Sequence, residues 1–179
     1  NSSVKTILEK SDTFKGRLRK MKTKHLAGIK NKEVLYKENN CTFRFNIDST
    51  YFSPRLSNER KELAELIKKN EEVLVMFAGV APFSIVIAKN SKAKKVYSNE
   101  INREANKYAK QNIELNKLKD KVELLPGDVK KVATKLHEKK QKFDTIVMAR
   151  PQLKDSFLED AFKLTKKGIA KSGTKTSQT

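Results

Sequence analysis

The sequence has few of the residues that build disulfides and metal centres. It contains a single cysteine, Cys41, so no disulfide can form within the chain. No histidine stands near Cys41 in the sequence, which favours a packed strand residue over a nucleophile. The two histidines, His25 and His137, are far apart in the sequence and lie among lysines, so a zinc site is not expected. This composition predicts an intracellular protein without a metal ion.

Long apolar runs are absent as well. The longest uncharged stretch, residues 73–88, is shorter than a membrane span, and Gly79 and Pro82 interrupt it. Residues 1–10 contain no apolar segment of the kind found in secretory signal peptides. We therefore expect a soluble, cytoplasmic protein that does not enter a membrane.

Acidic residues are outnumbered: 21 Asp and Glu stand against 40 Lys and Arg, which gives a formal net charge of +19. A chain of this size rarely keeps such a field unless it meets a polyanion, so nucleic acid is the leading partner and an anionic membrane surface the second. Lysine supplies 33 of the basic residues, and lysine enrichment can also reflect genome composition or a hot habitat. The lysine runs at 20–24 and 139–142 are candidates for phosphate contacts, or else solvated surface.

The hydrophobic pattern divides the chain into three parts. Residues 1–50 are predicted to be a small, basic α+β accessory segment that faces RNA. Residues 1–32 are weakly patterned, whereas 33–37 and 42–47 read as two strands of a hairpin around the turn at 39–40. Residues 51–168 are predicted to be the main domain. Residues 169–179 show no periodicity and are expected to be disordered.

Strands alternate with helices in the main domain, which predicts a parallel sheet with right-handed crossovers and helices on both faces. A helix begins at residues 57–60, capped by Ser57 or Asn58. Pro82 suits a first helical turn. The predicted strands are 73–77, 95–98 (ending at Glu100), 122–125 and 143–148, and the further helices are 83–89, 103–116, one that ends near 139, and 155–165.

Ligands of such sheets bind beyond the carboxyl ends of the strands, where residues 77–81, Glu100, Asp128 and 149–152 should meet around one crevice. The small-residue turn at 77–82 lets the backbone approach a cofactor, although it lacks the three-glycine dinucleotide pattern. Glu100 could accept hydrogen bonds from two ribose hydroxyls or be a solvated strand end. Asp128 could face an adenine amine or cap the following helix.

Tyr51, Arg55 and Glu59 recur at every fourth residue. On a helix they would share one face, although Pro54 makes the first turn irregular. Arg55 could then hold an anionic oxygen while Glu59 takes a proton. The alternative is a surface salt bridge between these two residues, worth a few tenths of a kcal/mol.

Residues 51–60 (YFSPRLSNER) and 76–85 (MFAGVAPFSI) together resemble the archaeal and eukaryotic tRNA guanine-37 N1-methyltransferase family. Residues 26–48, 112–116, 127–128 and 156–158 are also similar, so the resemblance covers roughly 4–168. It implies a class I, Rossmann-like methyltransferase that uses S-adenosylmethionine as donor. The acceptor it implies is N1 of the guanosine at position 37 of tRNA, beside the anticodon.

The resemblance also implies roles for individual residues. Because N1 of guanine carries a proton, a base must remove it, and Glu59 would be that base. Arg55 would steady the guanine or the developing charge, and Arg19 would assist at the base edge. The residues that would surround the cofactor are Tyr51, Phe77, Ala78, Gly79, Val80, Glu100 at the ribose, Ile101, Asp128 at the adenine side, Val129, Ala149 and Pro151.

Several positions depart from the family. Val75 stands where Asp is usual, Ala149 where Asn is usual and Arg103 where Pro is usual. Ala81 replaces a glycine, and its methyl group would crowd the cofactor if this position needs a positive φ. The N-terminal domain that contacts the tRNA elbow and the closing strands after Gly168 are expected to be missing, as in a truncated or divergent member.

Three functions therefore stay open: an active, monomeric tRNA methyltransferase, a non-catalytic tRNA- or cofactor-binding remnant, and a related wyosine-pathway transferase that moves the aminocarboxypropyl group.

Overall fold

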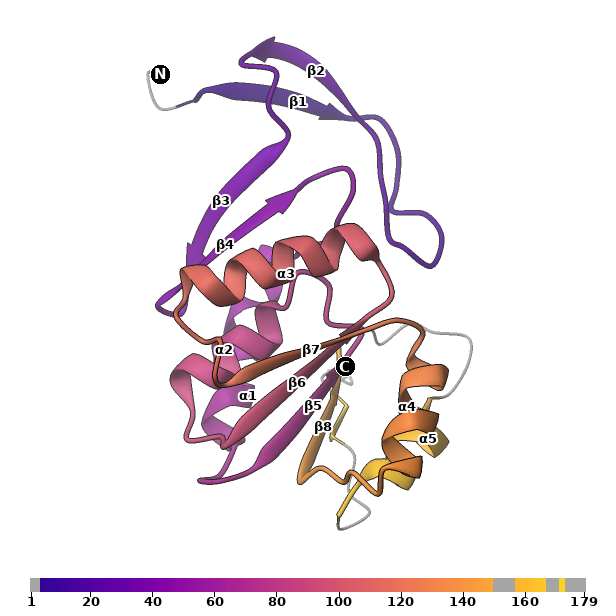
Figure 1. The fold of residues 1–179 in the computed structure, drawn as a ribbon. Coiled ribbons are helices and arrows are strands. Elements are labelled where there is room, and N and C mark those ends of the chain that lie inside the picture. The colour runs from indigo at the N-terminus through magenta and orange to yellow at the C-terminus, as the bar shows by residue number, and fades with distance from the viewer. Residues whose placement is uncertain (1–3, 150–156, 167–170, 173–179) are drawn as a thin grey trace, which may run out of the picture.

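The computed structural model describes residues 4–149, 157–166 and 171–172. Its centre is a parallel sheet with the strand order β7-β6-β5-β8-β9 (Figure 1). The predicted parallel sheet is confirmed, and each predicted strand of the main domain lies within two residues of an observed one. The strands are β5 Glu72–Met76, β6 Lys95–Glu100, β7 Val122–Pro126, β8 Thr145–Met148 and β9 Lys171–Ser172.

Strand β5 shows why the sheet forms. It lies between β6 and β8, with Val73 opposite both Val96 and Thr145. Successive side chains of a strand point to opposite faces. Accordingly Val73 and Val75 pack into one buried apolar cluster, and Leu74 and Met76 pack into the other. A strand that is apolar on both faces is stable only between two helical layers.

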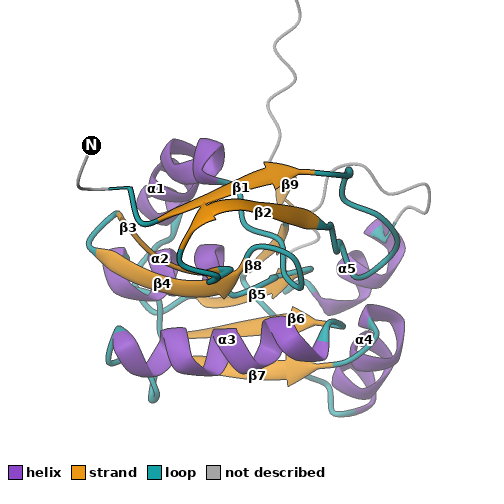
Figure 2. Cartoon of the chain, turned by 90° about the horizontal axis from the view of Figure 1, so that it is seen from above, coloured by secondary structure: helices purple, strands orange, loops and turns teal. Residues whose placement is uncertain are grey.

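Helices cover the two faces as predicted. One face carries α1 Ser57–Leu66, α2 Pro82–Asn90 and α3 Arg103–Leu115, whereas the other carries α4 Val129–Glu138 and α5 Leu158–Leu164 (Figures 1 and 2). Pro82 occupies the first turn of α2, as expected. The predicted side-chain cap of α1 is wrong: the N-cap position is Leu56, because the short 3₁₀ turn Pro54–Leu56 leads directly into the helix.

Two antiparallel hairpins precede the sheet domain, β1 Thr6–Lys10 with β2 Thr23–Gly28 and β3 Glu33–Glu38 with β4 Cys41–Asn46. The second hairpin was predicted. The first was not, because its strands bury no residue and so lack the apolar alternation that identifies a strand. The described residues 4–50 contain no helix, so the helical part of the expected α+β segment is wrong for this stretch.

Strand β4 is attached to α3 through two asparagine side chains. Asn112 accepts a hydrogen bond from the Arg44 amide (2.7 Å) and donates to the Arg44 carbonyl (3.0 Å). Asn116 makes the same pair of bonds with Thr42, at 2.9 and 2.8 Å. The two asparagines are four residues apart on the helix, a rise of about 6.0 Å. Their two partners are two residues apart on the strand, a rise of about 6.7 Å, so the spacing of the side chains matches that of the backbone groups they bind. The 112–116 motif thus docks the second hairpin.

The second hairpin is also held by a buried ion pair. Arg60 of α1 donates to both carboxylate oxygens of Glu38, at 2.5 and 2.7 Å, and to the Ser53 carbonyl at 3.0 Å. The two side chains are 1% and 3% exposed. Cys41, at the start of β4, is buried as predicted, and burial raises the pKa of its thiol to about 11. A protonated, buried thiol is a packing group and a poor nucleophile.

The end of the chain differs from expectation at one point. Lys171–Ser172, within a stretch predicted to be disordered, form a two-residue strand parallel to β8. Such a short edge strand has no periodicity to read. The other residues of 169–179 and the beginning of the helix expected at 155 lie outside the described residues.

Candidate cofactor site and catalytic crevice

A cavity of about 330 Å³ lies at the carboxyl ends of the parallel strands. Its walls come from the turn after β5, the end of β6 with the start of α3, the residues before α1, the residue after β8, and the loop between β1 and β2. We call this loop, residues 11–22, the strap; it descends from the first hairpin toward the N-terminal end of α3 (Figure 1). The lining residues are Arg17, Leu18, Arg19, Tyr51, Ser53, Arg55, Leu56, Phe77, Gly79, Glu100, Ile101, Asn102, Ala105 and Ala149.

The turn after β5 has an unusual backbone. Phe77, Gly79 and Ala81 have φ angles of 59°, 59° and 66°, in the left-handed region that favours glycine. At Gly79 a Cβ atom would lie 3.3 Å from the Tyr51 carbonyl oxygen, so glycine also allows the backbone at Tyr51 to lie close to this turn. Of the four predicted contacts in this turn, Phe77 and Gly79 line the cavity, whereas Ala78 and Val80 are buried in the core and do not line it.

Glu100, the last residue of β6, lines the cavity. Its Oε2 accepts a hydrogen bond from the Gly79 amide at 2.8 Å, and its Oε1 accepts one from the Asn102 amide at 2.7 Å. A carboxylate offers about four acceptor positions, so two remain for a ligand. The backbone thus fixes the orientation of a double acceptor beside the cavity, which is the arrangement expected for binding a ribose.

Asp128 and Val129 do not line the cavity. Asp128 caps α4 through the Lys130 amide at 3.0 Å, which is one of the two roles predicted for it. It also forms an ion pair with Arg17 of the strap, and this hydrogen-bonded guanidinium lowers the pKa of the Asp128 carboxyl. Val129, the first residue of α4, is buried in the apolar cluster on that face of the sheet. Asp128 therefore connects the strap to the edge of the sheet domain.

Arg19 lies against two aromatic rings. Its guanidinium carbon is 4.4 Å from the ring centroid of Tyr51 and 5.5 Å from that of Phe14. The two rings meet edge to face at 4.8 Å. Arg19 and Tyr51 line the cavity together with Arg55, so the structure brings these three predicted residues to its wall. Such a wall can contact a planar base by stacking and by hydrogen bonds.

Glu59 lies in the first turn of α1, four residues after Arg55, and does not line the cavity. It is partly buried, and this burial raises the pKa of its carboxyl, although the neighbouring Arg60 opposes the shift. The alternative of a surface salt bridge is not realised, since no ion pair between described residues joins Arg55 to Glu59.

Sequence reasoning missed Asn102, which connects three walls of the cavity. Its Oδ1 caps α3, and its amide group donates to the carbonyls of Leu18 (3.1 Å) and Ser49 (2.9 Å). The side chain is buried. An asparagine directly before an amphipathic helix is a recognised capping signal, but its two bonds to distant segments have no signature in the sequence.

Among the positions that depart from the family, some line the cavity and others are buried in the core. Ala149 lines the cavity, whereas Val75 is fully buried in the sheet. Ala81 does have the positive φ that was suspected, but its methyl group is buried in the core and does not enter the cavity. The cost of Ala81 is therefore backbone strain and not a collision with a ligand. Pro151 lies outside the described residues.

None of the helices among the described residues is long and apolar enough to cross a membrane. Residues 4–149, 157–166 and 171–172 also contain no group of three or more His, Cys, Asp or Glu side chains placed to share a metal ion.

Comparison with known proteins identifies a family. Residues 34–171 match the family model described as the TRM5/TYW2 methyltransferase domain. A relative from Nanoarchaeum equitans, named tRNA (guanine(37)-N(1))/4-demethylwyosine(37)-methyltransferase Taw22, is 49% identical over 115 residues, which are 64% of this chain and 38% of the relative.

Solved structures agree. The complex of aTrm5 and tRNALeu superimposes with a TM-score of 0.80 at 34% identity, over 90% of this chain and 46% of that one. Methanocaldococcus jannaschii TYW2 in complex with AdoMet gives 0.70 at 34% identity, over 80% and 63%. These matches confirm the Rossmann-like fold and the family resemblance. The chain spans between about a third and a half of the length of the first curated relatives.

Proposed function

Because the chain belongs to the TRM5/TYW2 methyltransferase domain family, we propose that it is the catalytic part of an enzyme that methylates tRNA. The reaction is transfer of a methyl group from S-adenosylmethionine to N1 of guanosine 37. The observation that carries the proposal is the oriented Glu100 carboxylate in a cavity that Arg19, Tyr51 and Arg55 also line. In this proposal residues 1–50 face the RNA and 51–168 hold the cofactor, with strap residues 17–19 completing the cavity.

The residues present fit the cofactor. A cavity of about 330 Å³ falls within the range of small-molecule sites, roughly 300–1,000 Å³. Glu100 would accept hydrogen bonds from the ribose hydroxyls, and the apolar side chains of Phe77, Ile101 and Ala105 would contact the purine. The cofactor supplies a methyl group on a positively charged sulfur, which makes that carbon electrophilic. Asp128 is assigned no direct contact, because it is engaged as a helix cap and by Arg17.

The chain's own contribution to the chemistry concerns the proton on N1. A general base acts best when its pKa is close to the working pH, and burial moves the pKa of Glu59 upward from the ordinary carboxyl range. We assign Glu59 the role of base. Arg55, which lines the cavity, would stabilise the negative charge that develops on the guanine as the proton leaves. Arg19 would fix the base edge while stacked against Tyr51.

The test is transfer of labelled methyl from S-adenosylmethionine to unmodified tRNA. The controls are a Glu59→Gln variant and a tRNA in which guanosine 37 is replaced. We expect incorporation to fall by roughly 10²-fold or more in the variant, as for the loss of a general base, while cofactor binding is unchanged. Full incorporation into the substituted tRNA would refute the assigned position. Binding of cofactor and tRNA without any transfer would favour the non-catalytic alternative.

A second candidate substrate is 4-demethylwyosine at the same tRNA position. It is favoured by the double name of the Nanoarchaeum equitans relative. Mass analysis of the modified nucleoside separates the possibilities, because guanosine and 4-demethylwyosine differ in the mass of the base that gains the methyl group. An aminocarboxypropyl product differs from both in the mass of the added group. Location in the cytoplasm and a monomeric state stay predictions.

A further inference from the structure

We propose that a second hollow, next to the cofactor cavity, binds the phosphates that flank the target nucleotide in a single-stranded RNA loop. The inference rests on the proposed function and assigns a site to the RNA backbone. The hollow has a volume of about 400 Å³ and is more open to solvent than the cavity. We call it the lysine hollow; Asp12, Lys15, Lys20, Met21, Lys22, Asp48 and Ser49 line it.

The lysine hollow and the cavity share two walls. Strap residues 17–19 line the cavity, and the next three strap residues, 20–22, line the hollow. The same holds for the segment before α1, where Tyr51 lines the cavity and Ser49 lines the hollow. A nucleotide whose base enters the cavity past Arg19 and Tyr51 therefore leaves its backbone neighbours beside the hollow.

The positive charge of the lysine hollow is only partly neutralised. Lys15 pairs with Asp12 at 2.7 Å, and Asp48 pairs with Lys32 at 2.5 Å. Lys20 and Lys22 form no ion pair with any acid among the described residues. Both side chains are exposed. Two cations therefore remain available for an anion in a hollow whose carboxylates are already engaged.

The backbone holds these two lysines in place. Lys15 and Lys20 pair through both of their amides, at 2.8 and 3.3 Å. The Met21 amide donates to the Asp48 carbonyl at 3.1 Å, and the Lys22 carbonyl accepts from the Ser11 amide at 3.1 Å. Lys20 and Lys22 stand two residues apart where the strap leads into β2, an interval of about 6.7 Å in extended chain. This interval is comparable to that between successive phosphates of one nucleic-acid strand.

The geometry favours a loop over a duplex. A base can enter an enclosed pocket only after it has left its stack, at a cost of a few kcal/mol that is smallest where the nucleotide is already unpaired. Phosphate contacts next to the pocket offset this cost without reading sequence. Backbone cations beside the part of the cavity that Arg19 and Tyr51 line are therefore the arrangement needed to hold one flipped nucleotide.

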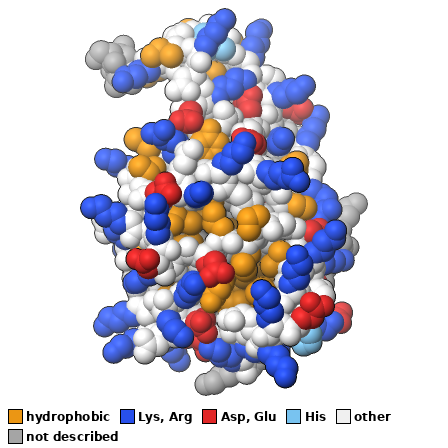
Figure 3. Space-filling view, viewed as in Figure 1, with side chains coloured by type: hydrophobic (Ala, Val, Ile, Leu, Met, Phe, Trp, Pro, Cys, Tyr) orange, Lys and Arg blue, Asp and Glu red, His pale blue; other side chains and the backbone are white. Residues whose placement is uncertain are grey.

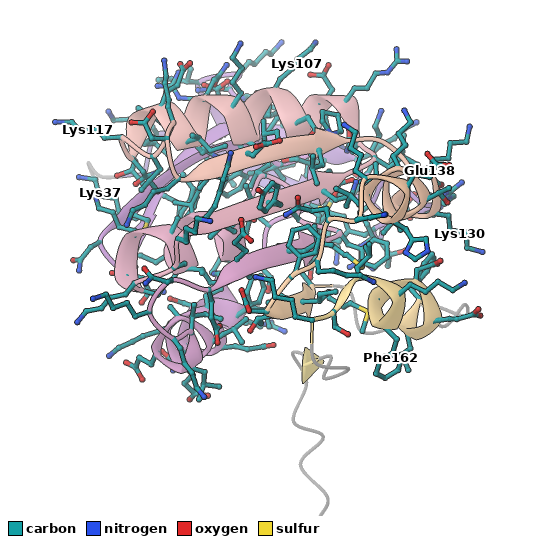
Figure 4. The ribbon with its side chains drawn as sticks, turned by 60° about the horizontal axis from the view of Figure 1, so that its bottom comes forward. Lys37, Lys107, Lys117, Lys130, Glu138 and Phe162 are labelled. Atoms are coloured by element: carbon teal, nitrogen blue, oxygen red, sulfur yellow. The ribbon has the colours of Figure 1, made fainter. Side chains whose placement is uncertain are left out.

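General surface charge does not make this assignment, because lysine and arginine side chains are spread over the whole face in Figure 3. The other lysine run, 139–142, follows the C-terminal end of α4. Lys130 and Glu138, both labelled in Figure 4, are the second and the last residue of this helix. Lys139 lies eleven residues, or about 16 Å of helix, beyond Asp128, where the strap meets the sheet domain. The lysine hollow therefore favours the run at 20–24 over the run at 139–142 as the site of phosphate contacts, a choice that the sequence alone leaves open.

The test compares two double variants with the same change of charge, Lys20→Gln/Lys22→Gln and Lys139→Gln/Lys140→Gln. The probes are a short unmodified anticodon stem–loop RNA and a blunt RNA duplex, each titrated over a range of salt concentrations. We expect the first variant to weaken stem–loop binding roughly tenfold and to reduce the slope of log K against log salt by about 1.4, or 0.7 per phosphate contact. The second variant should change binding less than about twofold, and neither should alter cofactor affinity or the unfolding temperature.

The outcomes separate this inference from the proposed function. Selective loss of stem–loop binding in the first variant supports the lysine hollow even if no methyl is transferred. Equal loss in both variants, or equal loss for duplex and stem–loop, overturns it even if methyl transfer to guanosine 37 is observed. Binding to anionic lipid vesicles that depends on Lys20 and Lys22 while RNA binding does not would also overturn it.

Discussion

The two N-terminal hairpins have strands of similar length and are attached to the sheet domain in different ways. The second hairpin is part of the core. Three residues of β4, Cys41, Phe43 and Phe45, are buried in the apolar cluster that α1 and α2 share. The first hairpin buries none of its residues, and Ile7 and Leu26 are about half exposed.

The attachments of the second hairpin are buried and polar. Asn112 and Asn116 bind the backbone of β4, and Arg60 binds Glu38 of β3. Asn112 also donates to the Val80 carbonyl at 3.1 Å, so this dock extends to the turn that forms the cavity floor. Directional bonds in a low-dielectric interior fix one arrangement of these elements.

The attachments of the first hairpin lie at its strap and at the start of β2, and they are exposed or only partly buried. Arg17 pairs with Asp128 at the surface, and the Leu18 carbonyl accepts from Asn102. The Thr23 hydroxyl donates to Asp48 at 2.7 Å, and Lys32 donates to the Thr23 carbonyl at 3.1 Å. The difference indicates a division of tasks. One hairpin stabilises the fold and the turn after β5, whereas the other brings the strap to the cavity with little burial of its own residues, and in the proposed function it presents the strap to RNA.

The largest effect is expected from a variant that breaks an attachment of the second hairpin to the sheet domain. Arg60→Ala should lower the free energy of unfolding by about 3–5 kcal/mol, because it leaves the Glu38 carboxylate buried without a partner. Urea unfolding followed by circular dichroism measures it.

The matched control is Lys32→Ala, which removes the partner of Asp48 in a pair that is 38% and 22% exposed. This loss should be within about 1 kcal/mol. The double variant Arg60→Met/Glu38→Leu should regain most of the stability, since apolar groups of similar volume can replace a buried pair. Equal losses for Arg60→Ala and Lys32→Ala would remove the distinction between the hairpins.

The same contrast explains what could be predicted from the sequence. The buried strands of the sheet and the β3–β4 hairpin have apolar patterns, so their positions could be read, and the strand-end rule brought Phe77, Gly79, Glu100 and Ala149 to one cavity. The first hairpin has no such pattern. Its strap reaches the cavity through tertiary contacts such as Asn102 with Leu18, which local sequence does not encode. Asp128 stayed undecided because an aspartate before a helix serves a ligand and a cap equally well.

A second, intermediate effect concerns the turn that the dock supports. Ala81→Gly should raise the free energy of unfolding by about 1 kcal/mol, because an alanine at φ 66° is strained where glycine is not. Thermal unfolding would record the gain. Ala78→Gly in the same turn has no positive φ to relieve and should destabilise. A loss of stability in Ala81→Gly would mean that the buried methyl group contributes more packing than the backbone strain costs.

The smallest effect tests the tether of the first hairpin. Arg17→Gln removes the guanidinium that lowers the pKa of Asp128, so this pKa should return toward the ordinary carboxyl value, as measured by NMR titration of the carboxyl carbon. A carboxyl whose pKa is lower in the folded state contributes stability that is present above its unfolded pKa and is lost as the pH falls through the folded one. The wild type should therefore exceed the variant slightly near neutral pH, by less than about 1 kcal/mol because the Arg17 side chain is 72% exposed, and should lose this advantage in acid. High salt should reduce the same difference in stability between wild type and variant.

Lys107→Gln, which breaks an exposed pair within α3, is the control and should leave the pKa of Asp128 unchanged. If the advantage of the wild type persisted below the lowered pKa, Arg17 would hold the strap by packing, and the tether of the first hairpin would resemble the dock of the second more closely than the ion pair alone implies.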